Sequence, residues 1–300
     1  MKLLVVGGSG FLGRHLLAEA SRRGIAALGT TTRTDPRPGL FRFDLAEDRS
    51  IRDAAPAGFF KDGPVRVVVC SCTTPMDRCR TDWDFAYKVN VSNTIRLIDE
   101  VAELKARAVF ISTSYVFDGS LGYYPEDWPH SPTSAYGEHK SVVDKHVTAA
   151  HRDALVVRLD KIMGADPAEA HPFSEWWNLY RAGKPVVCIE NQILSPTLVD
   201  DLAGAILTAC RLGLRGAYHL TGPEAFPRDH LARHFFRTMG VPAAVQTRPM
   251  AAFAFADPRP LNTYLDSSRF AAETGFLFTP MSAVARRFRA STARDAARAA

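Results

Sequence analysis

The amino-acid sequence predicts an α/β fold, with a doubly wound parallel sheet and a smaller C-terminal α/β lobe. Three observations support this prediction. The N-terminus carries a short apolar segment, a glycine-rich turn and a helical pattern in direct succession. Further short apolar segments follow, separated by segments of helical spacing, as in consecutive βαβ units. The chain has 300 residues, of which 46% are hydrophobic, which is enough for one large domain and a lobe.

The first strand and its turn contain the strongest motif. Residues 3–6 are an uninterrupted apolar run, typical of a strand buried on both faces. Glycines at 7, 10 and 13 follow, and a helical pattern begins around them. In a dinucleotide-binding turn, the three glycines permit the tight bend, the backbone's approach to a pyrophosphate and close helix packing. The N-terminus of the helix then faces the phosphates. The sequence therefore predicts a Rossmann domain with a nucleotide site.

The end of the second strand normally selects between NAD and NADP. We expect this strand at residues 26–30, and Thr32 and Arg33 follow it. NAD enzymes place an acidic side chain near this position for the ribose hydroxyls, whereas an arginine accommodates the 2′-phosphate of NADP. We therefore predict cofactor contacts from Thr32 and Arg33, with NADP (NADPH) preferred and NAD possible.

The residues suited to catalysis follow the fifth strand, which we expect at 107–111. Thr113 comes just after it, and Tyr136 and Lys140 are spaced i, i+4, so that both side chains share one helix face. A free tyrosine has a pKa near ~10, and a nearby ammonium favours the phenolate. We expect Lys140 to lower the pKa of Tyr136 toward the operating pH, where proton transfer is effective. Thr113 would orient a substrate carbonyl.

These motifs, in this order, resemble the extended short-chain dehydrogenase/reductase family, and within it the dTDP-4-dehydrorhamnose reductase-like branch. The resemblance covers nearly the whole chain, including the stretch Tyr-Val-Phe-Asp-Gly at 115–119. It implies the following cofactor contacts: Gly7, Gly10, Phe11, Leu12, Gly13, Asp44, Leu45, Cys70, Ser71, Cys72, Asn90, Tyr136 and Lys140. It implies substrate contacts from Thr74, Thr113 and Tyr115. Two further candidates come from the residues themselves: Lys161, which could meet an anionic substrate, and Trp177, which belongs to a helix with a large aromatic surface that could form a wall of the substrate cleft. For Trp177, placement in the core of the lobe is the alternative.

Two positions depart from the branch. Ser114 stands where the branch usually carries Asp, and Ser114 with Tyr115 cannot serve as the acid–base pair of a sugar-nucleotide dehydratase. After Arg158 the branch often carries a tryptophan that packs on the sugar nucleotide, whereas Asp160 and Lys161 occupy this region. The departures argue against dehydration and against a rhamnose-pathway substrate, and Lys161 could still meet an anionic one.

Composition and charge bear on partners and location. The net charge of +5 suits an anionic ligand, but the arginines are spread along the chain and no nucleic-acid recognition motif is present. No apolar run approaches the ~20 residues of a membrane helix. Five cysteines, an odd number without metal-ligand spacing, suggest free thiols in a reducing compartment. We expect a cytoplasmic protein with no metal, no nucleic acid and no membrane partner, and a possible homodimer.

The domain division follows the motifs. We expect residues 1–158 to form the NAD(P)-binding domain and residues 159–300 to form mainly a substrate-binding lobe. Within the lobe, residues 185–211 should return to the sheet as a strand and a helix. The arginine-rich and alanine-rich end, residues 281–300, is expected to be a solvated helix.

The predicted function is NADP-dependent reduction of a ketone, on a nucleotide-linked keto-deoxysugar or a related small molecule. The cofactor supplies the hydride, and the protein orients and protonates. Two alternatives stay open. An NAD-dependent nucleotide-sugar epimerase uses the same residues but returns the hydride. A nonenzymatic NADP-binding regulatory subunit would retain the fold without turnover.

Overall fold

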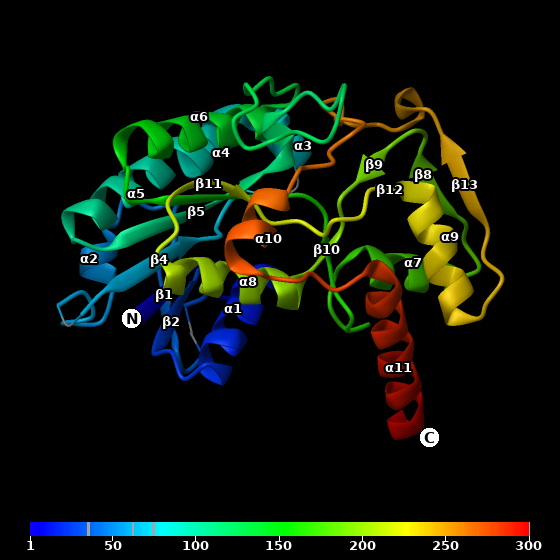
Figure 1. The fold of residues 1–300 in the computed structure, drawn as a ribbon, viewed down its shortest axis with the longest axis horizontal. Helices are drawn as coiled ribbons and strands as arrows, with labels where there is room; N and C mark the ends of the chain where they lie inside the picture. Colours follow the sequence, from blue (N-terminus) through cyan, green and yellow to red (C-terminus); the bar gives the residue numbers. More distant parts are fainter. Residues whose placement is uncertain (35–36, 62, 74–75, 300) are drawn as a thin grey trace.

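A parallel sheet forms the centre of the computed structural model (Figure 1). The structure describes residues 1–34, 37–61, 63–73 and 76–299, with side chains up to residue 294. Within this part, seven strands are ordered β11-β6-β5-β4-β1-β2-β3. All of their pairings are parallel. The strand bounds are β1 Lys2–Val6, β2 Ala27–Thr31, β3 Leu40–Arg42, β4 Val65–Val69, β5 Arg107–Thr113, β6 Leu155–Leu159 and β11 Gly216–His219.

The helices and the shorter strands complete the chain. The helices are α1 Phe11–Arg22, α2 Ile51–Ala54, α3 Met76–Thr81, α4 Trp83–Tyr87, α5 Asn93–Glu103, α6 Ala135–Ala150, α7 Pro172–Arg181, α8 Val199–Leu212, α9 Arg228–Met239, α10 Ser268–Thr274 and α11 Met281–Ala299. A π-turn, η1, spans Lys88–Ser92, and 3₁₀ turns span Ser114–Val116 (η2) and Met250–Ala252 (η3). The short strands are β7 Ile162–Met163, β8 Val186–Ile189, β9 Ile193–Leu194, β10 Thr197–Leu198, β12 Phe226–Pro227 and β13 Val245–Arg248.

Strand β1 shows why its segment is an unbroken apolar run. Leu3 and Val5 pack in the cluster that contains residues of α1 and α8, whereas Leu4 and Val6 pack in the cluster of α5 and α6. All four side chains are fully buried, because successive residues of a strand point to opposite faces of the sheet. Figure 1 shows α5 and α6 on one side of the sheet and α1 and α8 on the other. The doubly wound fold predicted from the sequence is confirmed.

The strand order places the site. The chain proceeds outward from β1 through β2 to β3, and then returns to the other side of β1 with β4. In open α/β sheets, ligands bind beside the carboxyl ends of the strands where the order reverses. Here that point lies between β1 and β4, so the glycine turn after β1 and residues 70–73 after β4 meet there.

The second lobe has its own core. Helices α7, α9 and α11 pack around aromatic side chains that include Phe173, Phe235 and Phe288. Strand β8 pairs with β13 in this lobe, so the expectation that residues 185–189 return to the large sheet is wrong. Helix α8 does pack against that sheet, and β11 supplies the added edge strand instead. A short apolar run can pair with any exposed strand edge, and its sequence does not name the partner.

The last helix is also more buried than expected. Met281, Val284, Ala285 and Phe288 on α11 are at most 1% exposed and belong to the core of the lobe. Only the later part of this helix extends away from the body (Figure 1).

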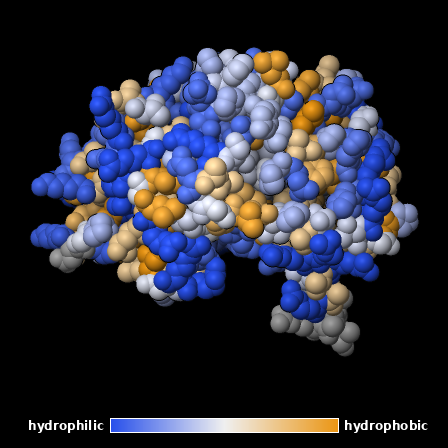
Figure 2. All heavy atoms as spheres, viewed as in Figure 1, coloured by the Kyte–Doolittle hydropathy of each residue, from blue (hydrophilic) through white to orange (hydrophobic). Residues whose placement is uncertain are grey.

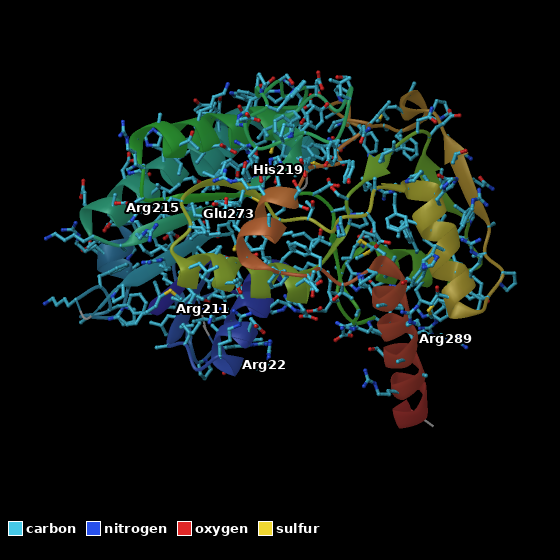
Figure 3. The ribbon with its side chains drawn as sticks, viewed as in Figure 1. Arg22, Arg211, Arg215, His219, Glu273 and Arg289 are labelled. Atoms are coloured by element: carbon cyan, nitrogen blue, oxygen red, sulfur yellow. The ribbon has the colours of Figure 1, made fainter. Side chains whose placement is uncertain are left out.

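The drawn face of the molecule has a mixed surface (Figure 2). On the face drawn in Figure 2, hydrophobic residues are scattered among hydrophilic ones. Figure 3 shows Arg22 on α1, Arg211 on α8, Arg215 just before β11 and Arg289 on α11. Among the described helices, none combines the length and the apolar character needed to span a bilayer.

Candidate active site

The glycine turn adopts a conformation that requires glycine. Gly7 has a positive φ of 88°, and its N–H donates to Oγ1 of Thr30 at 2.9 Å. A Cβ placed on Gly13 would lie 2.2 Å from the carbonyl oxygen of Gly7, so α1 packs directly on the turn. Gly10 precedes α1, and no side chain caps the helix. The first N–H groups of α1 are therefore available to an anion, as a pyrophosphate site requires.

A cleft of about 630 Å³ opens at the carboxyl ends of the strands. It runs from the glycine turn past the ends of β2, β4 and β5 to the start of α6. The predicted residues that line it are Gly7, Gly10, Phe11, Leu12, Gly13, Thr32, Asp44, Leu45, Cys70, Ser71, Cys72, Thr113, Tyr136 and Lys140. The sequence analysis missed other lining residues, among them Ser9, Thr31, Phe43, Arg78, Ile111 and Asp160. The glycine cradle and the cleft fit a dinucleotide.

Arg33 lies outside this cleft. It lines a second hollow of about 770 Å³ together with Arg14 and Arg37. The two hollows share Ser9 and Thr31, so the second begins where the end of β2 meets the glycine turn. Arg33 and Arg37 give this neighbouring hollow positive charge, whereas Arg14 is paired with Glu169 at 2.9 Å.

Asn90 also lies outside the cleft, and it supports the wall from behind. It is buried in the π-turn η1, and its Oδ1 accepts the N–H of Thr73 at 2.7 Å. Its Nδ2 donates to Sγ of Cys79 at 3.5 Å. Asn90 therefore holds the segment after β4, and it is not among the residues that line the cleft.

Tyr136 and Lys140 share one face at the start of α6. The N-cap residue Ser134 accepts the N–H of Gly137 through Oγ at 3.2 Å, which fixes where the helix begins. A Cβ on Gly137 would lie 2.2 Å from the carbonyl oxygen of Tyr115, so the first turn of α6 rests on η2. Lys140 is 3% exposed, and its ammonium lies 6.0 Å from the centre of the Tyr136 ring.

The protonation of Tyr136 differs from the sequence-based expectation. Burial raises the pKa of Tyr136 well above its ordinary value, and the nearby Cys72 and Cys79 add to this. A hydrogen bond with the side chain of Thr113 acts in the opposite direction on this pKa. Lys140 does not reverse the shift, and its Nζ donates to the carbonyl oxygen of Ile111 at 2.8 Å. Tyr136 is therefore a neutral phenol at neutral pH and can donate a proton.

Asp160 is a half-buried carboxylate at this end of the cleft that the sequence analysis did not assign. Its Oδ1 accepts the hydroxyl of Ser114 at 2.9 Å, and its Oδ2 accepts the N–H of Ser195 at 2.6 Å. Burial raises the pKa of Asp160, and hydrogen bonds from Ser195, Thr263 and Ser114 oppose this. The two departures from the branch pattern, at Ser114 and after Arg158, are therefore in contact. The presence of both departures in one sequence was the signal that could have pointed to Asp160.

The predicted substrate residues fall into different places. Tyr115 packs edge-on against Tyr136, with ring centres 6.1 Å apart, and burial raises its pKa to about 12. Burial lowers the pKa of Lys161, with Arg228 adding to the effect. Trp177 stacks on Tyr180 of α7 and packs against the lobe core, outside the lining of the cleft. Thr74 lies outside the described residues.

A charged network ties the lobe to helix α6. Asp257 is 4% exposed, and its Oδ2 accepts the N–H of Ala135, the first residue of α6, at 2.7 Å. Arg80 donates to the other oxygen of Asp257 at 2.6 Å. Nearby, Arg259 donates to Asp77 at 2.7 Å through Nη2, while its buried Nη1 has no hydrogen-bond partner among the described residues.

The fold and this site define an extended short-chain dehydrogenase/reductase, a class of NAD(P)-dependent oxidoreductases. The model of the RmlD substrate binding domain family matches residues 1–292, so the chain belongs to that family.

Individual relatives agree with this assignment. The chain is 30% identical to the dTDP-4-dehydrorhamnose reductase of Mycobacterium tuberculosis over 88% of its length and 83% of that protein. It is 32% identical to a probable dTDP-4,6-dihydroxy-2-methyloxan-3-one 4-ketoreductase of Streptomyces antibioticus, over 90% of this chain and 88% of that one. A dTDP-4-dehydrorhamnose reductase from Bacillus anthracis, solved in complex with NADP, has the same fold, with a TM-score of 0.82 at 21% identity. That match covers 96% of this chain and 99% of the other.

Proposed function

We propose that this protein is an NADPH-dependent reductase of a ketone on a nucleotide-linked keto-deoxysugar. The observation that carries the proposal is the placement of Thr113, Tyr136 and Lys140 at the end of a cleft that begins at the glycine cradle. The relatives whose names describe reduction of dTDP-linked ketosugars support the same reaction class. Residues 159–300 are proposed to supply most of the substrate contacts.

The cationic hollow beside the cleft supports the choice of NADP. Arg14, Arg33 and Arg37 surround a space that is continuous with the glycine turn through Ser9 and Thr31. The 2′-phosphate of NADP is an anion at the end of the second strand, where an arginine pairs with it. Ser9, Gly10 and the first N–H groups of α1 would hold the pyrophosphate.

The proton chemistry follows from the state of Tyr136. When bound, the nicotinamide supplies a hydride to the carbonyl carbon. The neutral phenol of Tyr136 gives its proton to the carbonyl oxygen, so that hydride and proton together convert the ketone into an alcohol. The Thr113 hydroxyl orients the same oxygen, and the Lys140 ammonium stabilises the phenolate that remains.

The anionic part of the substrate has candidate partners in the lobe. Arg228 and Arg259 both lie close enough to Tyr115 to lower its pKa against the larger effect of burial. Lys161 lies beside Arg228 and Asp160. Nη1 of Arg259 is buried and has no hydrogen-bond partner among the described residues, so it is a donor that a phosphate oxygen would satisfy. These three cations support a substrate that carries a nucleoside diphosphate.

The test is direct. Purified protein is incubated with NADPH or NADH and a panel of dTDP-linked and UDP-linked 4-ketosugars, and nicotinamide absorbance is followed. We expect oxidation of NADPH with a nucleotide-linked ketosugar and no reaction with the free sugar. Tightly bound NAD that co-purifies, with epimerised product and no net oxidation, would establish the epimerase instead. Binding of NADPH without turnover, together with a stable heteromeric partner, would establish a regulatory subunit.

The cytoplasmic location and the homodimer stay predictions.

A further inference from the structure

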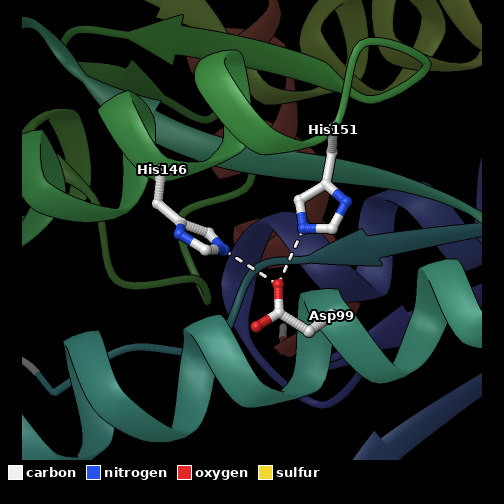
Figure 4. Close-up of side chains that lie close together, drawn as sticks. All are labelled: Asp99, His146 and His151. Atoms are coloured by element: carbon white, nitrogen blue, oxygen red, sulfur yellow. Dashed lines mark hydrogen bonds and ion pairs between the residues drawn. The ribbon is translucent and has the colours of Figure 1, made fainter.

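Three side chains converge on one point away from the cleft. Asp99 on α5 accepts hydrogen bonds through Oδ1 from Nε2 of His146 at 2.8 Å and from Nε2 of His151 at 2.7 Å. One candidate ligand atom from each residue lies within 4.8 Å of the other two. Figure 4 shows the imidazoles descending from α6 and from the residue after it toward the carboxylate on α5. None of the three lines the cleft described above.

The arrangement is more organised than an ordinary surface ion pair. Both histidines present the same ring nitrogen, Nε2, to the same oxygen, and their ring centres are 5.5 Å apart. His146 lies in the last part of α6, and His151 is its C-cap residue. The side chains are 45%, 30% and 17% exposed for Asp99, His146 and His151, so they are held in place and still reachable from solvent.

The distances from Oδ1 of Asp99 to the two Nε2 atoms suit a small ion after a slight opening of the cluster. In a tetrahedral site with bonds of about 2.0–2.1 Å, neighbouring ligand atoms are about 3.3 Å apart. The two contacts of Asp99 would lengthen by roughly half an ångström to reach that spacing. Asp99 is the most exposed of the three, and a rotation of its side chain would provide the change.

The donor set selects the kind of ion. Two imidazole nitrogens and one carboxylate oxygen suit Zn²⁺ and the neighbouring ions Co²⁺, Ni²⁺ and Cu²⁺, whereas Mg²⁺ and Ca²⁺ favour oxygen ligands alone. We propose that Asp99, His146 and His151 form a Zn²⁺ site that fastens the end of α6 to α5. Helix α6 also carries Tyr136 and Lys140, so the ion braces the helix on which the catalytic residues lie. A water molecule would occupy the fourth position.

The experiment measures metal binding by protein without a histidine tag. Calorimetry with ZnCl₂ should show one ion per chain, and MgCl₂ should show no comparable binding. Because loss of even an outer-shell partner costs about 10–100-fold in metal affinity, each of His146→Gln, His151→Gln and Asp99→Asn should weaken Zn²⁺ binding at least about tenfold. Zn²⁺ at about 100 times its Kd should raise the Tm of the unaltered protein by roughly 5 °C, and this rise should be absent in the variants.

His230→Gln is the matched control. His230 is 69% exposed and lies 3.9 Å from the Asp229 carboxylate, and among the described residues it belongs to no group of three candidate metal ligands. Its replacement should leave Zn²⁺ affinity unchanged. Reductase activity of the His146→Gln protein, assayed without added metal, should also be unchanged.

A second measurement does not depend on how the variants fold. Co²⁺ bound to nitrogen and oxygen ligands lacks the intense near-ultraviolet band that thiolate ligands give. We expect a spectrum without that band. A thiolate band would assign the metal to the cleft cysteines and overturn the proposal. Zn²⁺ affinity that is equal in the unaltered protein and all three variants, or no binding at all, would overturn it as well.

Discussion

The hydroxyl of Ser114 donates a 2.9 Å hydrogen bond to Oδ1 of Asp160, and this contact joins the end of β5 to the end of β6. Oδ2 of the same carboxylate accepts from Ser195, which belongs to the lobe. Asp160 thus links both strand ends to the lobe beside the proposed reaction centre. Desolvation raises the pKa of this half-buried carboxylate, and its hydrogen bonds from Ser195, Thr263 and Ser114 favour the ionised form.

We predict energetic coupling between Ser114 and Asp160. Ser114→Ala should destabilise the protein by about 1 kcal/mol, and Asp160→Ala by about 2–4 kcal/mol, because Asp160→Ala leaves buried donors without an acceptor. A double-mutant cycle, measured by urea unfolding, should give a coupling of about 0.5–3 kcal/mol. Simple additivity of the two substitutions would show that the contact has no energetic role.

We predict that Tyr136→Phe removes most turnover. Loss of a general acid typically lowers the rate about 10²–10⁴-fold. The Kd for NADPH should change little, because the glycine cradle is separate from the phenol. Steady-state kinetics and fluorescence titration measure the two effects. A Tyr136→Phe protein that keeps its turnover rate would show that another group supplies the proton.

The pH profile gives an independent test of Tyr136. The phenol donates only while it is protonated, and burial raises its pKa above the ordinary value. The rate of reduction should therefore lose no activity to Tyr136 ionisation up to about pH 10, and fall only above it. Loss of activity through a group with a pKa near neutrality, absent from Tyr136→Phe, would contradict the assignment of a raised pKa.

We predict that Gly13→Ala disrupts the nucleotide cradle. The new Cβ would lie 2.2 Å from the carbonyl oxygen of Gly7, so the turn and α1 must separate. Overpacking of this kind costs about 1–3 kcal/mol, and NADPH affinity should fall with it. Gly204→Ala is the control, because Gly204 also lies in a helix, α8. A Cβ added there would meet only the flexible end of Arg23 as its nearest neighbour, at 3.3 Å. Equal loss of NADPH affinity in both variants would show that the cradle is not the cause.

We predict that Arg33→Ser lowers affinity for NADPH but not for NADH. A hydrogen bond to a charged group contributes about 1.5–3 kcal/mol, which corresponds to roughly 10–100-fold in Kd. Fluorescence titrations with both cofactors measure the ratio. Arg211→Ser, on α8 and away from the hollow, should change neither Kd. If Arg33→Ser left the preference intact, the arginine hollow would not be the 2′-phosphate site.

Buried histidines predict how stability depends on pH. Burial lowers the pKa of His130 and of His139 to about 4, and that of His219 to about 3, from an ordinary value of 6.5. Between about pH 6.5 and 4 the unfolded chain binds more protons at these residues than the folded one, so the free energy of unfolding should fall as the pH falls. His139→Gln should make this fall shallower. Urea unfolding at several pH values measures the slopes, and identical slopes would exclude His139 as a contributor.

The cleft illustrates how much could be read from the sequence. The glycines, Asp44, the residues after β4 and the Thr113, Tyr136 and Lys140 set lie around one cleft, because local motifs fix short segments and the strand order brings their carboxyl ends together. Arg33, Asn90, Tyr115 and Lys161 lie outside the lining, because the local sequence does not determine which side chains of a segment face the cleft. Trp177 packs against the lobe core instead. An aromatic side chain on a helix shows the same sequence pattern whether it packs in a core or lines a cleft.

The sequence by itself determined the elements whose signals are local: the buried run of β1, the glycine turn, and the i, i+4 pair on α6. These depend on backbone sterics and helix periodicity within a few residues. Only the tertiary structure decided that β8 pairs with β13, that α11 fills the lobe core, and that burial raises the pKa of Tyr136. It also joined Ser114 to Asp160 and Asp99 to two histidines. Such contacts connect residues 46 to 52 positions apart, and pairing over that distance depends on how the whole chain packs.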